Sequence, residues 1–345
     1  MKKHEVNIPL VCICIPTYNV ADTIGATINS IINQTYSNIV VKIVDNASTD
    51  ATLDLVRTFI SDKLELIEND TNIGGEGNFN RCIELCCGDY TAIFHADDVY
   101  EPDIIQKQVA FLKNNMNAGA VLTEATLIND DSMVIGSIKV PKPIKSKSNV
   151  YSFLELFEAI LEHSNFLVCP SALVRTDVYK KNIKSFSGKA FGSSADLDVW
   201  LRVAIHSGLG ILPLPLINYR ISSKQFSTEV RRSIHRADFF KVMDFYLKKP
   251  FVHKMVTDFD RKCYAALDRR DSIMRAVNLC QLDKFNDAYD LCLSVLSTQA
   301  IMEAIKNKRG KFTLIFGGII ILSHFLRMDN LGKKVMKKMI RYFNK

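Results

Sequence analysis

The sequence predicts an α/β protein built on a Rossmann-like, mostly parallel sheet flanked by helices, followed by a helical C-terminal region. Apolar runs typical of buried strands alternate with amphipathic helical patterns between residues 10 and 220, and this alternation produces parallel βαβ units. One run, residues 90–95, is followed by two adjacent carboxylates, Asp97 and Asp98. Ligands of open α/β sheets bind beyond the carboxyl ends of strands, so we expect the functional site there.

Seven apolar runs predict the strands. Each run is four to nine residues long, and most are rich in β-branched residues, as strands of a covered sheet are. Asp97 and Asp98 suit a hard divalent cation bound to a phosphate, and capping of the next helix is the alternative for this pair. The predicted strands are residues 10–15, 39–44, 64–67, 90–95, 120–125, 172–175 and 211–219.

Helical patterns fill the intervals between these strands. Ile24, Ile28 and Ile31 share one face of the first predicted helix. The segment 48–50 supplies good cap residues for a second helix that carries Leu53, Val56 and Ile60. Further helices are expected at residues 79–87, 106–112, 152–161 and 195–204. Polar stretches rich in Gly, Pro, Lys or Ser predict surface loops at residues 69–77, 129–150 and 180–194.

The composition is that of a globular protein. The chain has 345 residues, of which 48% are hydrophobic and 23% charged, enough for one large domain and an appendage. The apolar residues 8–15 contain Pro9 and end at Pro16, which indicates a strand and not a signal peptide. The nine cysteines lack metal-ligand spacing, so we expect a reduced, cytoplasmic chain.

The positive charge is concentrated at the C-terminal end. Residues 301–345 hold 11 Lys and Arg against Glu303 and Asp329, a local charge of +9, whereas the whole chain carries +7. The remainder is therefore slightly acidic. It has no electrostatic footprint for nucleic acid, and we expect no nucleic-acid partner.

A dinucleotide-binding enzyme is a weak alternative for this order of elements, with Asp45 as the acid that grips ribose. The first turn, residues 16–19, lacks the G-x-G-x-x-G pattern that lets backbone approach a pyrophosphate. The glycine-rich residues 72–77 follow the wrong strand for that role.

Several motifs in order resemble those of the family 2 glycosyltransferases, which have the GT-A fold. The set is far more specific than any single member, and the resemblance covers roughly residues 8–228. The motifs are Ile-Pro-Thr-Tyr-Asn at 15–19, Asp-Asn-Ala-Ser-Thr-Asp at 45–50, Asn-Ile-Gly at 72–74, His-Ala-Asp-Asp at 95–98, Asp-Leu-Asp-Val-Trp at 196–200, and Tyr219-Arg220.

The resemblance implies a role for each of these motifs. Asp196 corresponds to the catalytic base, and Asp97 to the acid that holds Mn²⁺ or Mg²⁺. Asp45 is expected to accept a hydrogen bond from the base of the nucleotide. The other residues expected to bind the nucleotide sugar are Pro16, Thr17, Tyr18, Asn19, Asn72, Gly74, Asn78, His95 and Ala96. Acceptor contacts or supporting roles are expected for Asp198, Trp200, Tyr219 and Arg220.

Three positions depart from the family pattern. His95 replaces the usual first acid of Asp-x-Asp, and imidazole favours softer metals than Mg²⁺, so His95 is expected to contact the nucleotide or a water, or to be structural. Ser222 stands where a histidine is common, and Ala195 where a glutamate precedes the base.

Other assignments keep a structural alternative beside the functional one. Asp45 and Asp198 have helix-end roles as alternatives. For Trp200 the choice is core or acceptor platform, and for Asn72 and Asn78 it is sugar contact or turn former.

The C-terminal region, residues 229–345, is expected to be helical and distinct from a catalytic domain of residues 1–228. The apolar run 312–326 falls short of the ~20 residues of a membrane span. Residues 331–345 predict a basic amphipathic helix suited to an anionic membrane surface. The apolar face of this helix comprises Leu331, Val335, Met336, Met339, Ile340 and Phe343. A packed helical hairpin with a solvated lysine face is the alternative.

The sequence therefore predicts an inverting glycosyltransferase of surface polysaccharide synthesis. The expected donor is a nucleoside-diphosphate sugar, UDP-linked by preference, and the expected acceptor is a glycan or polyprenyl-linked sugar. The expected location is cytoplasmic and peripheral on the inner face of the membrane. A nucleotidyltransferase that releases pyrophosphate, and a non-catalytic sugar- or membrane-binding protein, are the alternatives.

Overall fold

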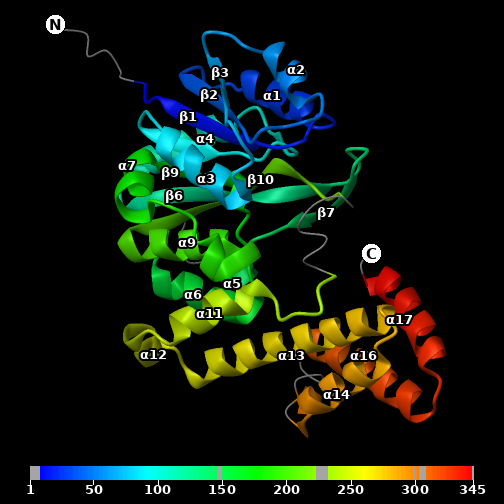
Figure 1. The fold of residues 1–345 in the computed structure, drawn as a ribbon. Coiled ribbons are helices and arrows are strands. Elements are labelled where there is room, and N and C mark those ends of the chain that lie inside the picture. The colour runs from blue at the N-terminus through cyan, green and yellow to red at the C-terminus, as the bar shows by residue number, and fades with distance from the viewer. Residues whose placement is uncertain (1–7, 146–149, 223–231, 299, 303–307, 344–345) are drawn as a thin grey trace, which may run out of the picture. The chain divides into compact units, whose positions relative to one another are not determined.

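The computed structural model describes residues 8–145, 150–222, 232–298, 300–302 and 308–343 (Figure 1). The chain divides into two compact units, Met1–Ser223 and Lys224–Lys345. Each unit contains a cluster of buried apolar residues of its own. The domain boundary expected at residues 228–229 lies outside the described residues.

The first unit is built on one sheet in the order β3-β2-β1-β4-β9-β6-β10-β5 (Figure 1). The four strands from β3 to β4 are parallel, whereas β9 runs antiparallel to both β4 and β6, and β10 is parallel to β6. These strands are β1 Val11–Thr17, β2 Ile39–Asp45, β3 Leu64–Glu68, β4 Tyr90–Ile93, β5 Val99–Tyr100, β6 Ala118–Ile128, β9 Leu173–Arg175 and β10 Gly208–Arg220. The predicted mostly parallel sheet is thus confirmed in its first half.

Helices cover this sheet. Every residue from Val11 to Ile15 is fully buried, as expected for a strand covered on both faces. Helix α1 buries Ile24, Ile28 and Ile31, the face that the sequence predicts. Ser152 caps α6 through a capping box with Glu155. The longer helices are α1 Ile24–Ile32, α2 Thr52–Arg57, α3 Gly74–Leu85, α4 Ile104–Asn114, α6 Phe153–His163 and α9 Ala195–His206.

The three predicted loops contain more structure than their composition suggests. Helix α3 begins at Gly74, inside the expected loop 69–77, although glycine is a poor helix former. The segment 129–150 includes β7 Val134–Ile138, which pairs with β6, a short helix α5 Lys142–Lys145 and the start of β8 Val150–Tyr151. Residues 180–194 form helical turns, among them α8 Gly188–Phe191. Pairing and packing with distant residues therefore override local composition at these places.

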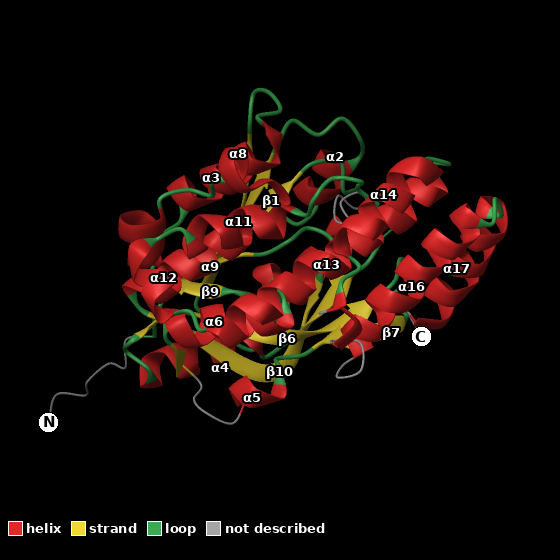
Figure 2. Ribbon diagram, turned by 90° about the horizontal axis from the view of Figure 1, so that it is seen from below, coloured by secondary structure: helices red, strands yellow, loops and turns green. Residues whose placement is uncertain are grey.

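The second unit is helical, as predicted (Figure 2). Thr257 caps the long helix α13 through a capping box with Asp260. The core of this unit joins residues of α13, α14, α16 and α17, among them Ile273, Cys292, Phe316 and Met336. No described helix is long and apolar enough to cross a membrane. The helices are α11 Asp238–Leu247, α12 Pro250–Met255, α13 Asp258–Gln281, α14 Phe285–Val295, α16 Lys308–Phe325 and α17 Asp329–Phe343.

Gly88, in the turn between α3 and β4, gives a test of the fold. Its φ is +68°, and a Cβ there would lie 2.6 Å from the Leu10 carbonyl oxygen. Gly88→Ala is therefore expected to lower the free energy of unfolding by at least about 2 kcal/mol, measured by urea titration. Gly75→Ala is the matched control, because a Cβ at Gly75 meets nothing within 4 Å. Equal stability of the two variants would contradict the turn geometry.

Candidate active site

Three strand ends meet at the place where the order of the sheet reverses. Strand β1 lies between β2 and β4, and the chain leaves these strands at Thr17, Asp45 and the segment 94–98. Ligands of open α/β sheets bind at such a switch point, outside the carboxyl ends of the strands. The sequence motifs of the first half of the chain therefore converge on one edge of the sheet.

The segment after β4 brings three possible metal ligands together. One donor atom from each of His95, Asp97 and Asp98 lies within 4.8 Å of the others. Asp98 is fully buried, and the His95 Nδ1 atom lies 3.9 Å from its Oδ2. His95 Nε2 and Asp98 Oδ2 are both buried and have no hydrogen-bond partner in the described part of the chain. Such orphaned atoms are rare in folded proteins, so this cluster fits a bound cation.

The electrostatics of the cluster agree with that fit. Burial raises the pKa of Asp98 well above its usual range, and the charge of Asp97 raises it further. Burial also lowers the pKa of His95, while the charge of Asp97 acts in the opposite direction. Two neighbouring carboxyl groups repel each other when both are ionised, and a divalent cation relieves this repulsion.

Contacts from several elements fix the backbone of this segment. The Thr27 hydroxyl donates to the carbonyls of Ala96 and Asp98 at 3.0 and 2.7 Å, and the Tyr100 hydroxyl accepts from the His95 amide at 2.8 Å. Arg220 donates its amide to Asp98 Oδ1 at 2.8 Å and its Nε to the Asp97 carbonyl at 2.9 Å. Arg220 is buried. Arg220 therefore holds the segment 97–98 in place through these two hydrogen bonds. Tyr219, the preceding residue, is half-buried.

Tyr18 follows the end of β1 and is exposed. The residue is 46% exposed, which leaves its ring available for stacking, and Pro16 is half-buried. Asn19 joins this turn to the next loop, since its Oδ1 accepts from the Thr49 amide at 2.8 Å. The motif at residues 16–19 thus leaves an aromatic ring at the switch point.

Asp45 does not face solvent. It is fully buried, and its carboxylate accepts from the Thr17 hydroxyl at 3.1 Å and from the Ser48 amide and hydroxyl at 2.8 and 2.6 Å. These donors satisfy the buried carboxylate, so Asp45 fixes the loop that follows β2. Its contact with the base of the nucleotide stays a prediction.

An asparagine network holds the next loop. Asn78 is buried and donates to the Val44 carbonyl at 2.8 Å, so it joins α3 to β2. Its contact with the sugar stays a prediction. Asn72 is exposed, and its Oδ1 accepts from Asn46 and from the Gly74 amide. Sequence reasoning gave no separate role to Asn46, which is buried and joins this loop to β2. The one signal in the sequence for a role of Asn46 is its position directly after Asp45 in the motif 45–50.

Asp196 lies in the first turn of α9 and is half-buried. Burial raises the pKa of its carboxyl to about 6 from the usual 3.8, although nearby backbone amides act in the opposite direction. Burial also raises the pKa of the Cys169 thiol well above its usual value, and the charges of Asp196 and Asp98 add to this effect. Asp196 at the start of α9 and Asp98 after β4 both raise the pKa of the same thiol. The two carboxyl groups therefore lie in the same region of the candidate site.

Two neighbours of Asp196 on α9 have structural positions. Asp198 is buried and accepts from Arg202 Nε at 2.8 Å, and Arg202 also donates to the carbonyls of Ile183 and Ser185. Trp200 is only 1% exposed, so it belongs to the core and cannot serve as an acceptor platform. Of the two acids at this helix end, Asp198 is thus the one held in place by an arginine.

The segment before α9 is held against α3, which sequence reasoning missed. Phe79 contacts the rings of His95 and Phe186 edge-on, with centroids 5.5 and 5.3 Å apart. Glu76 accepts from the Gly188 amide at 2.8 Å. The stretch 180–194, expected to be a surface loop, therefore packs beside the metal-ligand cluster.

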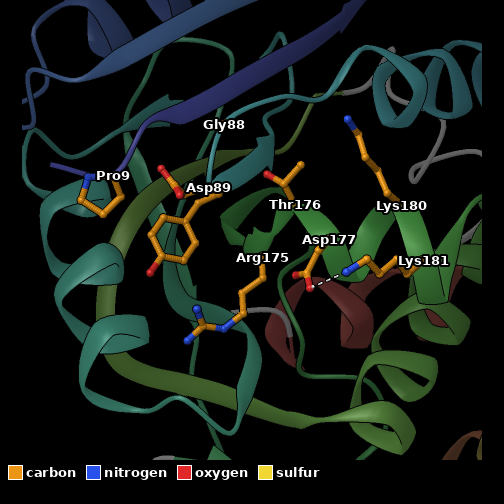
Figure 3. A pocket seen from close by; sticks show the side chains of 9 residues that line it. Pro9, Gly88, Asp89, Arg175, Thr176, Asp177, Lys180 and Lys181 are labelled. Atoms are coloured by element: carbon orange, nitrogen blue, oxygen red, sulfur yellow. Dashed lines mark ion pairs between the residues drawn. The ribbon is translucent and has the colours of Figure 1, made fainter. Parts of the chain in front are cut away.

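A separate hollow of about 490 Å³ lies at the opposite edge of the sheet (Figure 3). It opens at the amino ends of β1 and β4, next to Pro9 and Tyr90. Arg175 there donates to the carbonyls of Ala118 and Leu112, and Lys181 pairs with Asp177 at 3.6 Å. None of the site residues described above lines this hollow, so it is not the candidate active site.

The fold and site together define an enzyme of the GT-A class, with acids after the fourth strand and a further acid at a helix start. Residues 12–182 match the family described as Glycosyl transferase family 2, and the catalytic unit of this chain belongs to that family. The chain is therefore a glycosyltransferase. The nicotinamide-enzyme, nucleotidyltransferase and non-catalytic alternatives are set aside.

Known relatives and structures agree with this assignment. An uncharacterized glycosyltransferase of Haemophilus influenzae is 28% identical over 225 residues, covering 64% of this chain and 68% of that protein. The Escherichia coli UDP-Glc:alpha-D-GlcNAc-diphosphoundecaprenol beta-1,3-glucosyltransferase WfaP is 28% identical over 231 residues, covering 65% of this chain and 84% of that protein.

Two solved structures share the fold. S. aureus TarS in complex with UDP-GlcNAc superposes with a TM-score of 0.58 at 16% identity over 92% of both chains. The mannosyltransferase PcManGT from Pyrobaculum calidifontis, in complex with GDP-Man and Mn²⁺, gives 0.55 at 18% identity, covering 92% of this chain and 88% of that one. At these identities the likeness establishes the GT-A fold alone.

Proposed function

We propose that this glycosyltransferase inverts the anomeric centre of a UDP-sugar as it transfers the sugar to a lipid-linked glycan. The observation that carries the proposal is Asp196, a half-buried carboxyl whose pKa is raised to about 6. A general base is most effective when its pKa lies near the working pH. The neighbouring Asp198 is held by Arg202 at 2.8 Å, which leaves Asp196 for the chemistry.

The transfer is a single displacement. Asp196 accepts the proton of an acceptor hydroxyl, whose oxygen then bonds to the anomeric carbon of the donor. The bond from that carbon to the diphosphate oxygen breaks at the same time, and UDP leaves with the electron pair. Attack from the face opposite the diphosphate inverts the centre.

His95, Asp97 and Asp98 are the residues that would hold Mn²⁺ or Mg²⁺ in this reaction. When bound, the cation neutralises the charge of the departing diphosphate. An imidazole beside two carboxylates favours Mn²⁺ over Mg²⁺, so His95 acts as a ligand in this proposal, contrary to the expectation from sequence. Mn²⁺ in the PcManGT structure supports the same ion.

The donor and acceptor are proposed from the site and from the relatives together. Tyr18 offers an exposed ring for the nucleoside base, and TarS is solved with UDP-GlcNAc. WfaP takes a diphosphoundecaprenol-linked acceptor, and AmsB of Erwinia amylovora is named for amylovoran biosynthesis. These names support surface polysaccharide synthesis, with the reaction at the inner face of the membrane where such an acceptor resides.

The experiment that tests this function follows the products. Purified full-length protein is first screened with nucleotide sugars by thermal shift, with and without Mn²⁺. The stabilising donor is then incubated with a polyprenyl-diphosphate sugar. Release of UDP and an inverted linkage by NMR are the expected results. Release of pyrophosphate, or a retained anomeric configuration, would refute the proposal.

The raised pKa of Asp196 predicts a pH dependence. A general base must be deprotonated, so kcat/KM is expected to fall about tenfold per pH unit below pH about 6. Above that pH the profile is expected to be flat until another group titrates. A profile that stays flat down to the usual pKa of an aspartate would argue against Asp196 as the base.

A further inference from the structure

The outward face of helix α16 is apolar, which is unusual for a helix on a protein surface. Ile315, Leu322 and Phe325 are 41%, 58% and 77% exposed. Gly318 is exposed between them. Spacings of three and four residues place all four positions on one side of the helix. From Phe312 to Leu326 the chain has no Lys, Arg, Asp or Glu.

The opposite face of α16 is already occupied. Phe316 and Ile320 are buried in the core of the second unit, against residues of α13 and α14. The exposed stripe is therefore not the packing face of this helix turned to solvent. It is a second apolar face, beyond what the fold of this unit requires.

Further exposed apolar residues follow in the turn after α16 and in α17. Leu326, Met328 and Leu331 are about half exposed, and Val335 is 40% exposed. Helices α16 and α17 lie side by side in both views (Figures 1 and 2). We call this surface the hairpin patch: Ile315, Leu322, Phe325, Leu326, Met328, Leu331 and Val335. A group of large exposed apolar residues on one helical hairpin indicates a site of interaction.

The two helices that carry the hairpin patch are strongly basic. Residues 308–343 hold nine Lys and Arg and a single acid, Asp329. Asp329 is paired with His324 at 3.0 Å. Lys334 and Lys338 are exposed at positions three or four residues from Leu331 and Val335, so they share the outward side of α17.

These observations differ from the arrangement expected from sequence. Met336 is buried in the core of the second unit and Met339 packs against it, so the predicted apolar face of α17 is split between core and surface. Lys333 donates to the Gln281 carbonyl at 3.1 Å and pairs with Asp283, so it serves the packing of the helices. The side chains of Ile340 and Phe343 lie outside the described residues.

We propose that the hairpin patch is the surface by which this protein docks on an anionic lipid membrane. The outward side chains of α16 enter the boundary between headgroups and acyl chains, and Lys334 and Lys338 contact the lipid phosphates. Insertion is thus led by α16, with α17 supplying the charge. The inference rests on the proposed function and deepens it by naming the surface that meets lipid.

A second copy of the chain is the other candidate occupant, and the charge argues against it. A two-fold interface brings the same patch of each subunit together. It would bring the exposed Lys334 and Lys338 of the two copies close together, on helices that carry a single acid, Asp329. Like charges placed against each other destabilise an interface, whereas anionic lipid relieves them.

Co-sedimentation of the full-length protein with vesicles tests the proposal. Binding is expected with phosphatidylcholine vesicles that contain phosphatidylglycerol, and much less with phosphatidylcholine alone. Leu322→Gln and Phe325→Gln are each expected to weaken binding about tenfold. Lys334→Gln and Lys338→Gln are each expected to weaken it about fivefold. The matched controls are Phe259→Gln, at a site that is 60% exposed, and Lys262→Gln, both on α13; neither is expected to change binding.

A fluorescent reporter distinguishes insertion from simple charge attraction. The only tryptophan of the chain, Trp200, is buried. In the Phe325→Trp variant, the fluorescence of the new tryptophan is expected to shift to the blue on addition of vesicles and to be quenched by brominated lipids. The new tryptophan of Phe259→Trp is expected to show neither change. Circular dichroism of each variant reports whether it is folded.

Two results would overturn the proposal. One is unchanged vesicle binding by the folded Leu322→Gln/Phe325→Gln double variant. The other is a dimer in analytical ultracentrifugation that this double variant converts to monomer, without any lipid binding by the parent protein. Binding of UDP by the same variants is measured in parallel. Loss of lipid binding with UDP binding intact separates failure of the membrane surface from failure of the transferase site.

Discussion

Replacing Asp196 by Asn is expected to lower kcat by ~10²–10⁴-fold, the usual contribution of a general base. Asn has the shape of the carboxyl group but cannot accept the proton of the acceptor hydroxyl. The UDP-sugar should still bind with its ordinary affinity, because the residues proposed for the nucleotide lie on other elements, β1 and the segment after β4. Steady-state kinetics and calorimetry with UDP measure the two quantities separately.

The same substitution should make the protein more stable. The pKa of Asp196 is about 6 in the folded chain against the usual 3.8. Between these values the native state binds more protons than the unfolded chain, so stability falls as pH rises through this window. Above it, Asp196→Asn removes the desolvation cost of the ionised, half-buried carboxyl and is expected to raise the free energy of unfolding by about 1–3 kcal/mol. A variant that is both slower and more stable cannot owe its low activity to unfolding.

Asp198→Asn is the matched control for this prediction. Asp198 is buried and paired with Arg202, which holds the residue 183–185 segment against α9. Its loss is expected to lower stability by about 1–3 kcal/mol while most of the turnover remains. If instead the folded Asp198→Asn variant loses turnover and Asp196→Asn keeps it, Asp198 is the base.

Much of the first unit follows from local pattern. The strands begin and end within a few residues of the predicted positions because apolar runs between polar turns have few other solutions. The antiparallel insertion of β9 between β4 and β6 could not be foreseen, since it depends on pairing between residues far apart in the chain. Strand β7 was missed for the same reason, because it lies in a polar segment and forms by pairing with β6.

The motifs located the candidate site, but residue type and spacing did not distinguish the exposed side chains of that site from the buried ones. Asp45, Asn78 and Trp200 lie in or beside motifs, yet all three are buried. Asn46 organises the loop from inside a motif without having been singled out. Sequence gives residue type and spacing, whereas burial depends on which distant segments cover a side chain. Phe79 is an example, because its ring contacts both His95 and the distant Phe186.

The second large effect is expected at Asp97. Asp97→Asn removes one of the three donors of the cluster, whose donor atoms lie within 4.8 Å of one another. Changes to groups that merely orient a metal ligand cost ~10–100-fold in metal affinity, so loss of a ligand should cost at least about 100-fold. Calorimetry with Mn²⁺ and UDP, and the electron paramagnetic resonance of bound Mn²⁺, measure this without requiring turnover.

His95→Asp is the companion variant, because it tests the unusual imidazole in the same cluster. It replaces nitrogen by oxygen and makes a ligand set of three carboxylates, which suits Mg²⁺ better than the natural set does. The ratio of Mn²⁺ to Mg²⁺ affinity should therefore fall in His95→Asp, while it stays unchanged in the control variant Gly75→Ala. UDP binding that resists chelators in the parent protein and is unaltered in Asp97→Asn would show that this cluster holds no metal. An unchanged ratio in His95→Asp, with metal-dependent binding intact, would remove His95 alone from the ligand set, since Asp97 and Asp98 would still account for the cation.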